Sequence, residues 1–364
     1  MVFLYCEIGN QLFERPLKII QTKRLSELAA CFEQMEKASA SGHYLAGWLS
    51  YEAGYAFEPK LIRRTNFDFP LLQFGVYPAA GKVKKSKMLR PLPLVGCFNL
   101  GPEQYQEKIG RIQEYIVAGE TYQITFCLKQ KFAYEGNPKL LYRQLLDFQP
   151  VPYPAFIETD DLTILSFSPE LFFEKQGEKI TVKPMKGTLF RDNSWLNALL
   201  GGWQLHYDAK NRAENVMIAD LLRNDLGKIC HYGSVQTPKL FEVARYRTVY
   251  QMTSTVQGRL YQADMPYYEI FRALFPSGSV TGAPKLRAMQ IIRELENEER
   301  RIYTGAIGFI TPQREMRFNV PIRTILLQGR EGEMGVGGGI THYSTPQGEY
   351  EECQIKARFL QAAL

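Results

Sequence analysis

The sequence of 364 residues has few of the side chains that bind transition metals or build disulfide frameworks. Its six cysteines form no Cys-x-x-Cys pair, and its four histidines show no His-x-x-His spacing. A structural zinc site and a disulfide framework are therefore not expected. No apolar run reaches about 18 residues, the length that crosses a bilayer as a helix. The N-terminus also lacks the basic and apolar regions of a signal peptide. We expect no membrane span and a reducing, cytoplasmic location.

The chain also lacks low-complexity segments, internal repeats and a strong charge imbalance. Charged residues make up 23% of it, hydrophobic residues 45%, and the net charge is +6. This composition supports a core large enough for one large domain or two, and the mild positive charge suits anionic small molecules. The one dense basic run, residues 82–87, predicts a solvated loop. Nucleic-acid binding through this run is the alternative, which its shortness and its lack of interleaved aromatic residues disfavour.

Helix and strand patterns alternate along the chain and predict an α+β fold rather than a parallel βαβ series. The basic and proline-bearing stretch at 79–101 is the best boundary candidate. It predicts an N-terminal segment, 1–100, that packs on a catalytic domain, 101–364. We expect amphipathic helices over 102–118, 211–225, 284–298 and 346–362, irregular structure over 189–211, and strands over 306–311, 316–327 and 333–343.

Residues 180–188 predict a half-buried strand that runs into a tight turn carrying Lys186. Pro184 cannot donate a ladder hydrogen bond, so strand pairing should weaken there. Gly187 lets the backbone approach a ligand, and Thr188 offers a hydroxyl. A desolvated lysine has a lowered pKa and can act as a nucleophile. A solvated surface lysine is the alternative, because lysine is rarely buried.

The last predicted helix places Glu349, Glu352 and Lys356 at i, i+3 and i+7, and therefore on one face. A surface series of salt bridges would explain this spacing equally well. A metal site would need another carboxylate, and Glu214 in the first turn of its own helix is the candidate. Two glutamates with waters and substrate oxygens suit Mg²⁺, which takes few protein carboxylates.

Two segments rich in small residues indicate close approach of a ligand. Residues 276–285 lead into a helix and fail the spacing of a phosphate-binding loop, but free N–H groups there would favour an anion, phosphate or carboxylate. The glycine run at 335–339 lies inside a predicted strand, where it admits a ligand or forms a strained bulge. Arg323 lies in an apolar stretch of a predicted strand, so it should pair with a carboxylate of the protein or of a substrate.

Several motifs occur together and in order. They are Ser168-Pro169-Glu170, Pro184-Met185-Lys186-Gly187-Thr188, Arg212-Ala213-Glu214-Asn215, Arg223-Asn224-Asp225-Leu226-Gly227, Gly278-Ser279-Val280-Thr281-Gly282-Ala283-Pro284-Lys285, and Glu352 with Lys356. As a set, over roughly 101–364, they resemble the chorismate-utilising enzymes: anthranilate, isochorismate, salicylate and aminodeoxychorismate synthases. The resemblance implies a large antiparallel β-sheet sandwich with outer helices around a chorismate site.

Two positions favour the aminodeoxychorismate branch, which residues 47–53 also resemble. Gln123 stands where water-adding members of the family would carry a lysine. Lys186 stands where anthranilate synthases carry alanine, and the resemblance implies that it is the nucleophile of the amination reaction. An anthranilate synthase large subunit is the alternative within the family.

The resemblance also implies the roles of the remaining residues. Glu170 would be the general acid/base, Glu214 and Glu352 would hold Mg²⁺, and Glu349 would hold metal-bound water. Substrate contacts would come from Gly187, Thr188, Gln251, Tyr303, Arg323, Gly337, Gly339 and Lys356. Gln251 departs from the histidine of many members, so it can position but not transfer a proton. A separate glutaminase subunit would supply ammonia, and a separate lyase would convert the product to p-aminobenzoate for folate synthesis.

Overall fold

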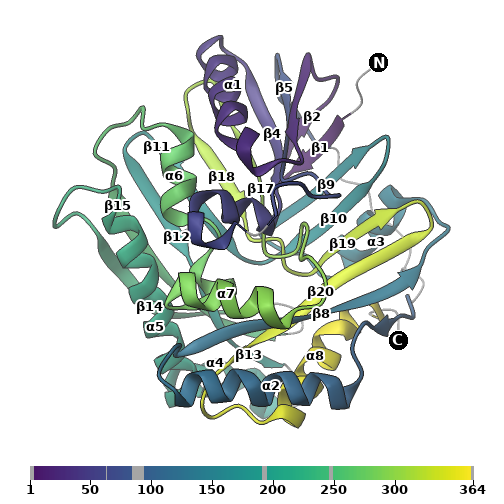
Figure 1. The fold of residues 1–364 in the computed structure, drawn as a ribbon, viewed down its shortest axis with the longest axis vertical. Coiled ribbons are helices and arrows are strands. Elements are labelled where there is room, and N and C mark those ends of the chain that lie inside the picture. Colours follow the sequence, from purple (N-terminus) through teal and green to yellow (C-terminus); the bar gives the residue numbers. More distant parts are fainter. Residues whose placement is uncertain (1–3, 63, 84–93, 191–194, 246–248, 362–364) are drawn as a thin grey trace.

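A computed structural model of the protein describes residues 4–62, 64–83, 94–190, 195–245 and 249–361. Its strands form two ten-stranded sheets, in which every described pairing is antiparallel (Figure 1). The expected α+β class and antiparallel sandwich are therefore confirmed.

Sheet A consists, in spatial order, of β16 (Gly282–Ala283), β8 (Gln123–Ala133), β20 (Glu331–Ile340), β19 (Thr324–Gln328), β10 (Thr163–Ser168), β9 (Tyr153–Thr159), β1 (Leu4–Ile8), β2 (Gln11–Phe13) and β6 (Gly81–Lys82), and β7 (Cys97–Phe98) pairs with β8. Sheet B consists of β13 (Met185–Phe190), β15 (Val249–Arg259), β12 (Lys179–Lys183), β11 (Leu171–Gln176), β18 (Met316–Asn319), β17 (Ala306–Ile310), β4 (Tyr44–Leu49), β5 (Leu72–Tyr77) and β3 (Lys18–Thr22), and β14 (Gln236–Arg245) pairs with β15.

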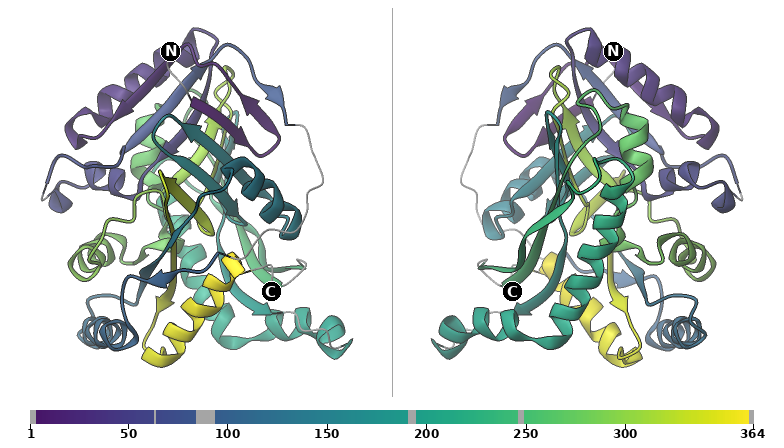
Figure 2. Two further views of the ribbon diagram at one scale, coloured as in Figure 1. Left: turned by 90° about the vertical axis from the view of Figure 1, so that its right-hand side faces the viewer. Right: turned by 90° about the vertical axis from the view of Figure 1, so that its left-hand side faces the viewer.

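The longer helices are α1 (Leu28–Ala40), α2 (Pro102–Val117), α3 (Pro138–Phe148), α4 (Trp195–Tyr207), α5 (Ala209–Gly227), α6 (Tyr267–Leu274), α7 (Lys285–Leu295) and α8 (Pro346–Ala357). The molecule is narrow at its N-terminal strands and broad at the opposite end, where α2, α4 and α8 lie (Figure 2). No helix among the described residues is long and apolar enough to cross a membrane.

Apolar side chains from both sheets meet between them. Cys6 and Ile157 from sheet A and Trp48 and Ile307 from sheet B belong to one buried cluster and are fully buried. Along their strands these residues alternate with others, such as Leu49 and Phe156, that are buried in a separate, larger cluster. The sheets are therefore held together at the narrow end, away from α4 and α8.

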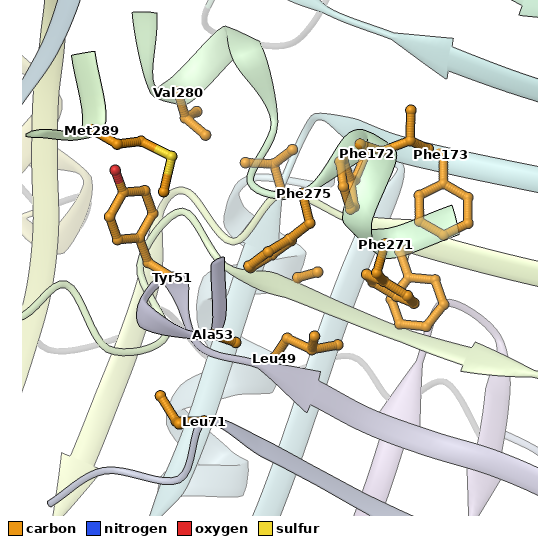
Figure 3. Packing of buried hydrophobic residues seen from close by; sticks show 14 of the residues in the cluster. Leu49, Tyr51, Ala53, Leu71, Phe172, Phe173, Phe271, Phe275, Val280 and Met289 are labelled. Atoms are coloured by element: carbon orange, nitrogen blue, oxygen red, sulfur yellow. The ribbon is translucent and has the colours of Figure 1, made fainter. Parts of the chain in front are cut away.

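A second cluster fastens α6 and the following loop to sheet B. Phe172 and Phe173 on β11 pack against Phe271 and Phe275 at ring-centroid distances between 5.5 and 6.4 Å (Figure 3). Such edge and tilted pairs each add about 0.5–1.5 kcal/mol beyond area burial. The loop that follows Phe275 therefore starts from a rigid anchor.

The N-terminal strands extend both sheets. β1 pairs with β9 in sheet A, and β4 pairs with β17 in sheet B. Both sheets are thus continuous across residue 100, and the proposed division into 1–100 and 101–364 stays a prediction.

Three local expectations were wrong. The segment expected to be irregular, 189–211, contains α4 and the start of α5. The strand expected over 316–327 is broken, because Pro321 follows β18 and Arg323 has φ +49°. Arg323 therefore lies half-buried in a turn, not in the middle of a strand.

Candidate active site

Two neighbouring strands of sheet A form one wall of the site. Gln123 opens β8 and is 1% exposed, yet both polar atoms of its amide lack a protein partner. A Cβ added at Gly339 on β20 would overlap the Gln123 amide nitrogen and lie 3.2 Å from Lys186 Nζ. Buried polar atoms nearly always have a partner, so this amide is available to a ligand.

The glycine run of β20 is regular strand. Its pairing with β8 continues without a shift from Glu331 to Ile340, which excludes the strained bulge. On one face, side chains at Gly335 and Gly339 would overlap Tyr303 and Gln123; on the other, one at Gly338 would lie 2.7 Å from Glu349 Oε2. The glycines therefore let side chains approach the strand from both faces.

Lys186 lies on sheet B and faces this wall. A register shift between Met185 and Thr188 interrupts the pairing of β13 with β15, and Gly187 within it has φ +94°, which glycine adopts without strain. Burial lowers the pKa of Lys186, although the charges of Glu214 and Glu170 oppose this shift. The expectation of a desolvated lysine agrees with this environment, whereas a solvated surface lysine does not.

Glu170 lies between β10 and β11 and is 3% exposed. Ser279 Oγ donates a hydrogen bond of 2.6 Å to Glu170 Oε1. Burial raises the pKa of Glu170 to about 7, while the Ser279 hydrogen bond, the Lys186 charge and the Met185 N–H oppose the rise. A carboxyl group with this pKa can donate or accept a proton near neutral pH.

The small-residue loop at 276–285 hydrogen-bonds to a carboxylate of the protein itself, that of Glu170. Ser277, Ser279 and Thr281 are buried, and Thr281 Oγ1 donates to the Ser277 carbonyl at 3.0 Å. Ser279 uses its hydroxyl on Glu170. Among the described residues, the hydroxyls of this loop thus bond to other groups of the protein. Binding of an external anion at the loop stays a prediction.

Glu214 on α5 lies within electrostatic range of Glu352 and Lys356 on α8. Glu352 pairs with Lys356 at 2.6 Å, and Lys356 Nζ also donates to the Gly337 carbonyl at 2.6 Å. Ser344 donates to Glu349 at 2.6 Å. Burial raises the pKa of Glu214, and the nearby charge of Glu352 adds to the rise. Glu349 on this face of α8 is buried, whereas the Glu352 side chain is 52% exposed, so the metal-binding role of the face stays a prediction.

These carboxylates suit a hard cation better than a transition metal. Burial also raises the pKa of Glu349, with Glu352 adding to the rise. The described residues contain no ready-made group of three metal ligands. One or two carboxylates are nevertheless what Mg²⁺ commonly takes from a protein, and a cation between Glu214 and Glu352 would relieve their mutual repulsion.

The other predicted substrate contacts surround this centre. Gln251 pairs with Thr188 across β15 and β13; its amide is 1% exposed and lacks a protein partner at both polar atoms. The Thr188 side chain lies outside the described part of the structure. Tyr303 is buried beside Gly335. Thr304 N donates to the Pro321 carbonyl at 3.0 Å, which places the turn carrying Arg323 beside Tyr303.

Sequence reasoning missed two contributors. From the sequence, Gln123 was identified only as the position where some family members carry a lysine, although its buried amide faces Lys186. Ser279 was noted only within a small-residue loop, although it bonds Glu170. The alternating hydroxyls at 277, 279 and 281 were the available signal, because buried hydroxyls need partners.

Two other features lie apart from this site. A hollow of about 450 Å³ lies between α4 and strands β14 and β15, with Trp203, His206 and Tyr250 in its lining, and it contains none of the predicted site residues. Of the basic run at 82–87, only Lys82 and Val83 are among the described residues.

Comparison with known proteins agrees with this geometry. Residues 8–362 match the family described as chorismate binding enzyme. The chain is 38% identical over 262 residues to aminodeoxychorismate synthase component 1 of Bacillus subtilis (strain 168), covering 71% of this chain and 55% of that protein. It is 35% identical over 266 residues to anthranilate synthase component 1 of Aquifex aeolicus (strain VF5), covering 73% and 54%. The chain thus spans about half the length of these relatives.

Solved structures share the fold. Anthranilate synthase component I from Streptococcus pneumoniae TIGR4 superposes with a TM-score of 0.82 at 24% identity, covering 98% of this chain and 92% of that chain. A putative 2,3-dihydroxybenzoate-specific isochorismate synthase from Bacillus anthracis gives 0.81 at 18% identity, covering 100% and 96%.

Proposed function

This chain belongs to the chorismate-binding enzyme family, and we propose that it acts as component 1 of an aminodeoxychorismate synthase. The reaction would convert chorismate and ammonia to 4-amino-4-deoxychorismate. The observation that carries the proposal is the placement of Lys186: a half-buried lysine of lowered pKa, beside Gln123 and Gly339 and in the field of Glu170.

The first step uses Lys186 as the nucleophile. Its neutral amine bonds to C2 of the chorismate ring, the ring double bonds shift, and the C4–O bond breaks. Glu170 protonates the departing hydroxyl, which leaves as water. Burial supports both roles, because it disfavours the charged amine of Lys186 and the charged carboxylate of Glu170.

The second step returns the lysine to its starting state. Ammonia bonds to C4, the double bonds shift back, the C2–N bond to Lys186 breaks, and the new C4 ammonium group returns a proton to Glu170. Two displacements through a covalent adduct replace one difficult substitution at C4. Gln123 and Gln251 can hydrogen-bond the substrate in both steps but cannot transfer protons.

The remaining residues bind and orient the substrate. Glu214 and Glu352 would hold Mg²⁺, with Glu349 on its water shell, and the ion would neutralise the ring carboxylate of chorismate when bound. Tyr303 and Arg323 would bind the enolpyruvyl carboxylate. Ammonia would come from a glutaminase subunit, and a separate lyase would act on the product.

Product identification tests the proposal. Purified protein is mixed with chorismate, Mg²⁺ and an ammonium salt, and the products are separated and identified by mass spectrometry. We expect 4-amino-4-deoxychorismate without release of pyruvate. Anthranilate with pyruvate would instead identify an anthranilate synthase, the alternative that the 35% identity to the Aquifex aeolicus protein keeps open.

Lys186→Ala tests the nucleophile. We expect aminodeoxychorismate formation to fall by about a thousandfold or more. Without ammonia, intact wild-type protein should gain the mass of chorismate less one water, and the variant should not. Lys183→Ala is the matched control, since Lys183 is an exposed lysine at the end of β12. Full activity in Lys186→Ala would remove the covalent step.

A further inference from the structure

Arg300 lies behind the site and has every N–H group of its guanidinium accepted. It is 3% exposed. Nε and Nη2 donate to the two carboxylate oxygens of Glu296 at 2.8 and 2.6 Å. Nη1 donates to the Val280 carbonyl at 2.9 Å and to Thr304 Oγ1 at 3.2 Å, and Nη2 also donates to the Thr125 carbonyl at 2.6 Å. These contacts use all five donors of the side chain.

Apart from Glu296, each of these acceptors belongs to a segment that carries a site residue. Val280 follows Ser279, the residue that bonds Glu170. Thr125 lies on β8 two residues after Gln123. Thr304 follows Tyr303. One side chain thus links three segments that are far apart in the sequence.

The surroundings of Arg300 hold it in one orientation. Its guanidinium carbon lies 4.5 Å from the centre of the Tyr51 ring. Figure 3 shows Tyr51 beside Met289, with Val280 pointing into the same cluster. The backbone N–H of Arg300 donates to Glu52 at 2.7 Å, and Glu296 accepts a further bond from the Cys127 N–H at 3.1 Å.

We propose that Arg300 is a positioning residue, which fixes the Ser279 hydroxyl against Glu170 by holding the 277–281 loop onto β8. This role rests on the acid/base role of Glu170 in the proposed function. The charged or titratable groups around Arg300 are Glu296, Glu52, Tyr51 and Cys127. The charged group beside Glu170 is Lys186, and the Ser279 hydroxyl donates a hydrogen bond to Glu170.

A lysine could not replace this function. Its ammonium group has three donors at one point, whereas the planar guanidinium reaches four residues in fixed directions. With Arg300→Lys the charge opposite Glu296 remains, but the Val280 carbonyl or Thr125 carbonyl loses its donor. The loop is then free to shift, and the Ser279 hydrogen bond to Glu170 weakens.

The test compares Arg300→Lys, Ser279→Ala and the double variant. Chorismate loss is the readout, so that it does not depend on which product forms. We expect Arg300→Lys to lower kcat between about tenfold and a hundredfold, with a smaller change in KM. The limb of the pH profile on which activity falls with rising pH should move up by about one unit, because a carboxylate that loses a donor holds its proton more tightly.

Ser279→Ala should move the same limb in the same direction, and the double variant should be no worse than the more impaired single variant. Arg314→Lys is the matched control. Arg314 also pairs with a glutamate, Glu36, donates to two backbone carbonyls and has its guanidinium carbon 4.3 Å from a tyrosine ring centre, that of Tyr267. The Arg314→Lys variant should be less stable than the wild type, but the limb of its pH profile should not move.

The outcomes separate the inference from the function on which it rests. If Ser279→Ala moves the limb and Arg300→Lys does not, or if their effects on log kcat add, the inference is overturned alone. If Ser279→Ala leaves the limb in place, the acid/base role of Glu170 fails and the inference fails with it. Should Arg300→Lys not fold, Thr304→Val removes one acceptor of Nη1 and should give a smaller shift in the same direction; no shift would overturn the inference.

Discussion

Glu170 carries a cost in stability that its replacement should relieve. Its pKa rises from 4.5 to about 7 on burial in the folded protein. Between these two values the folded state binds more protons than the unfolded chain, so stability falls as pH rises, and the full cost is present above pH 7. The difference corresponds to about 3 kcal/mol at pH 8 and about 1 kcal/mol at pH 5.

Glu170→Gln should therefore be more stable than the wild type by up to about 3 kcal/mol at pH 8 and by much less at pH 5. The amide oxygen can still accept the Ser279 hydrogen bond. Equilibrium unfolding in urea at both pH values measures the difference. The same variant should lose chorismate consumption, because an amide cannot donate the proton that the departing hydroxyl needs.

Glu174→Gln on β11, the strand that follows Glu170, is the control. Glu174 pairs with Arg317 at the surface, where such pairs contribute about 0–1 kcal/mol. We expect little change at either pH. A Glu170→Gln protein that is no more stable than the wild type at pH 8, or equally stabilised at pH 5 and pH 8, would refute the view that burial penalises the ionised carboxyl group.

Two further predictions concern the glycine wall and a buried ion pair. Gly339→Ala should displace the Gln123 amide and crowd Lys186, which raises KM for chorismate and lowers stability by about 1–3 kcal/mol in urea unfolding; wild-type kinetics would contradict this placement. Lys285→Met should lower stability in thermal unfolding by less than about 3 kcal/mol, since it removes one of the two lysine partners of the buried Asp225 carboxylate, at 2.5 Å, and leaves the half-exposed Lys228 at 2.8 Å. Adding Asp225→Asn should recover most of this loss, and no recovery would show that the ion pair is not its source.

Sequence patterns located the site wherever spacing along one element decided the geometry. The i, i+3, i+7 series of Glu349, Glu352 and Lys356 predicted one helix face, and α8 presents it. The glycine run predicted close approach, and β20 permits it. Both features are local, so no knowledge of distant segments was needed.

The missed features depend on contacts between distant segments. α4 contains Gly201 and Gly202, which weaken a helix by about 1 kcal/mol each, yet Leu205 packs it onto Tyr250 and Met252. Arg323 looked like a strand residue because its neighbours are apolar, but Pro321 lacks the N–H that would continue the strand. Neither outcome can be derived from the residues of the segment alone.

The glycine-rich strand β20 also limits which positions can change when enzymes of this fold acquire different reactions. On that side the site is bounded by peptide backbone, and no point mutation except one to proline alters the donor and acceptor pattern of a backbone. A larger side chain there would fill the space and abolish the site. New reactions within this architecture should therefore arise from the side chains around this strand, through exchanges such as those at Gln123 on the neighbouring β8 and at Lys186 and Gln251 on the opposite wall. The strand fixes where the ring can lie, and the facing side chains decide what happens to it.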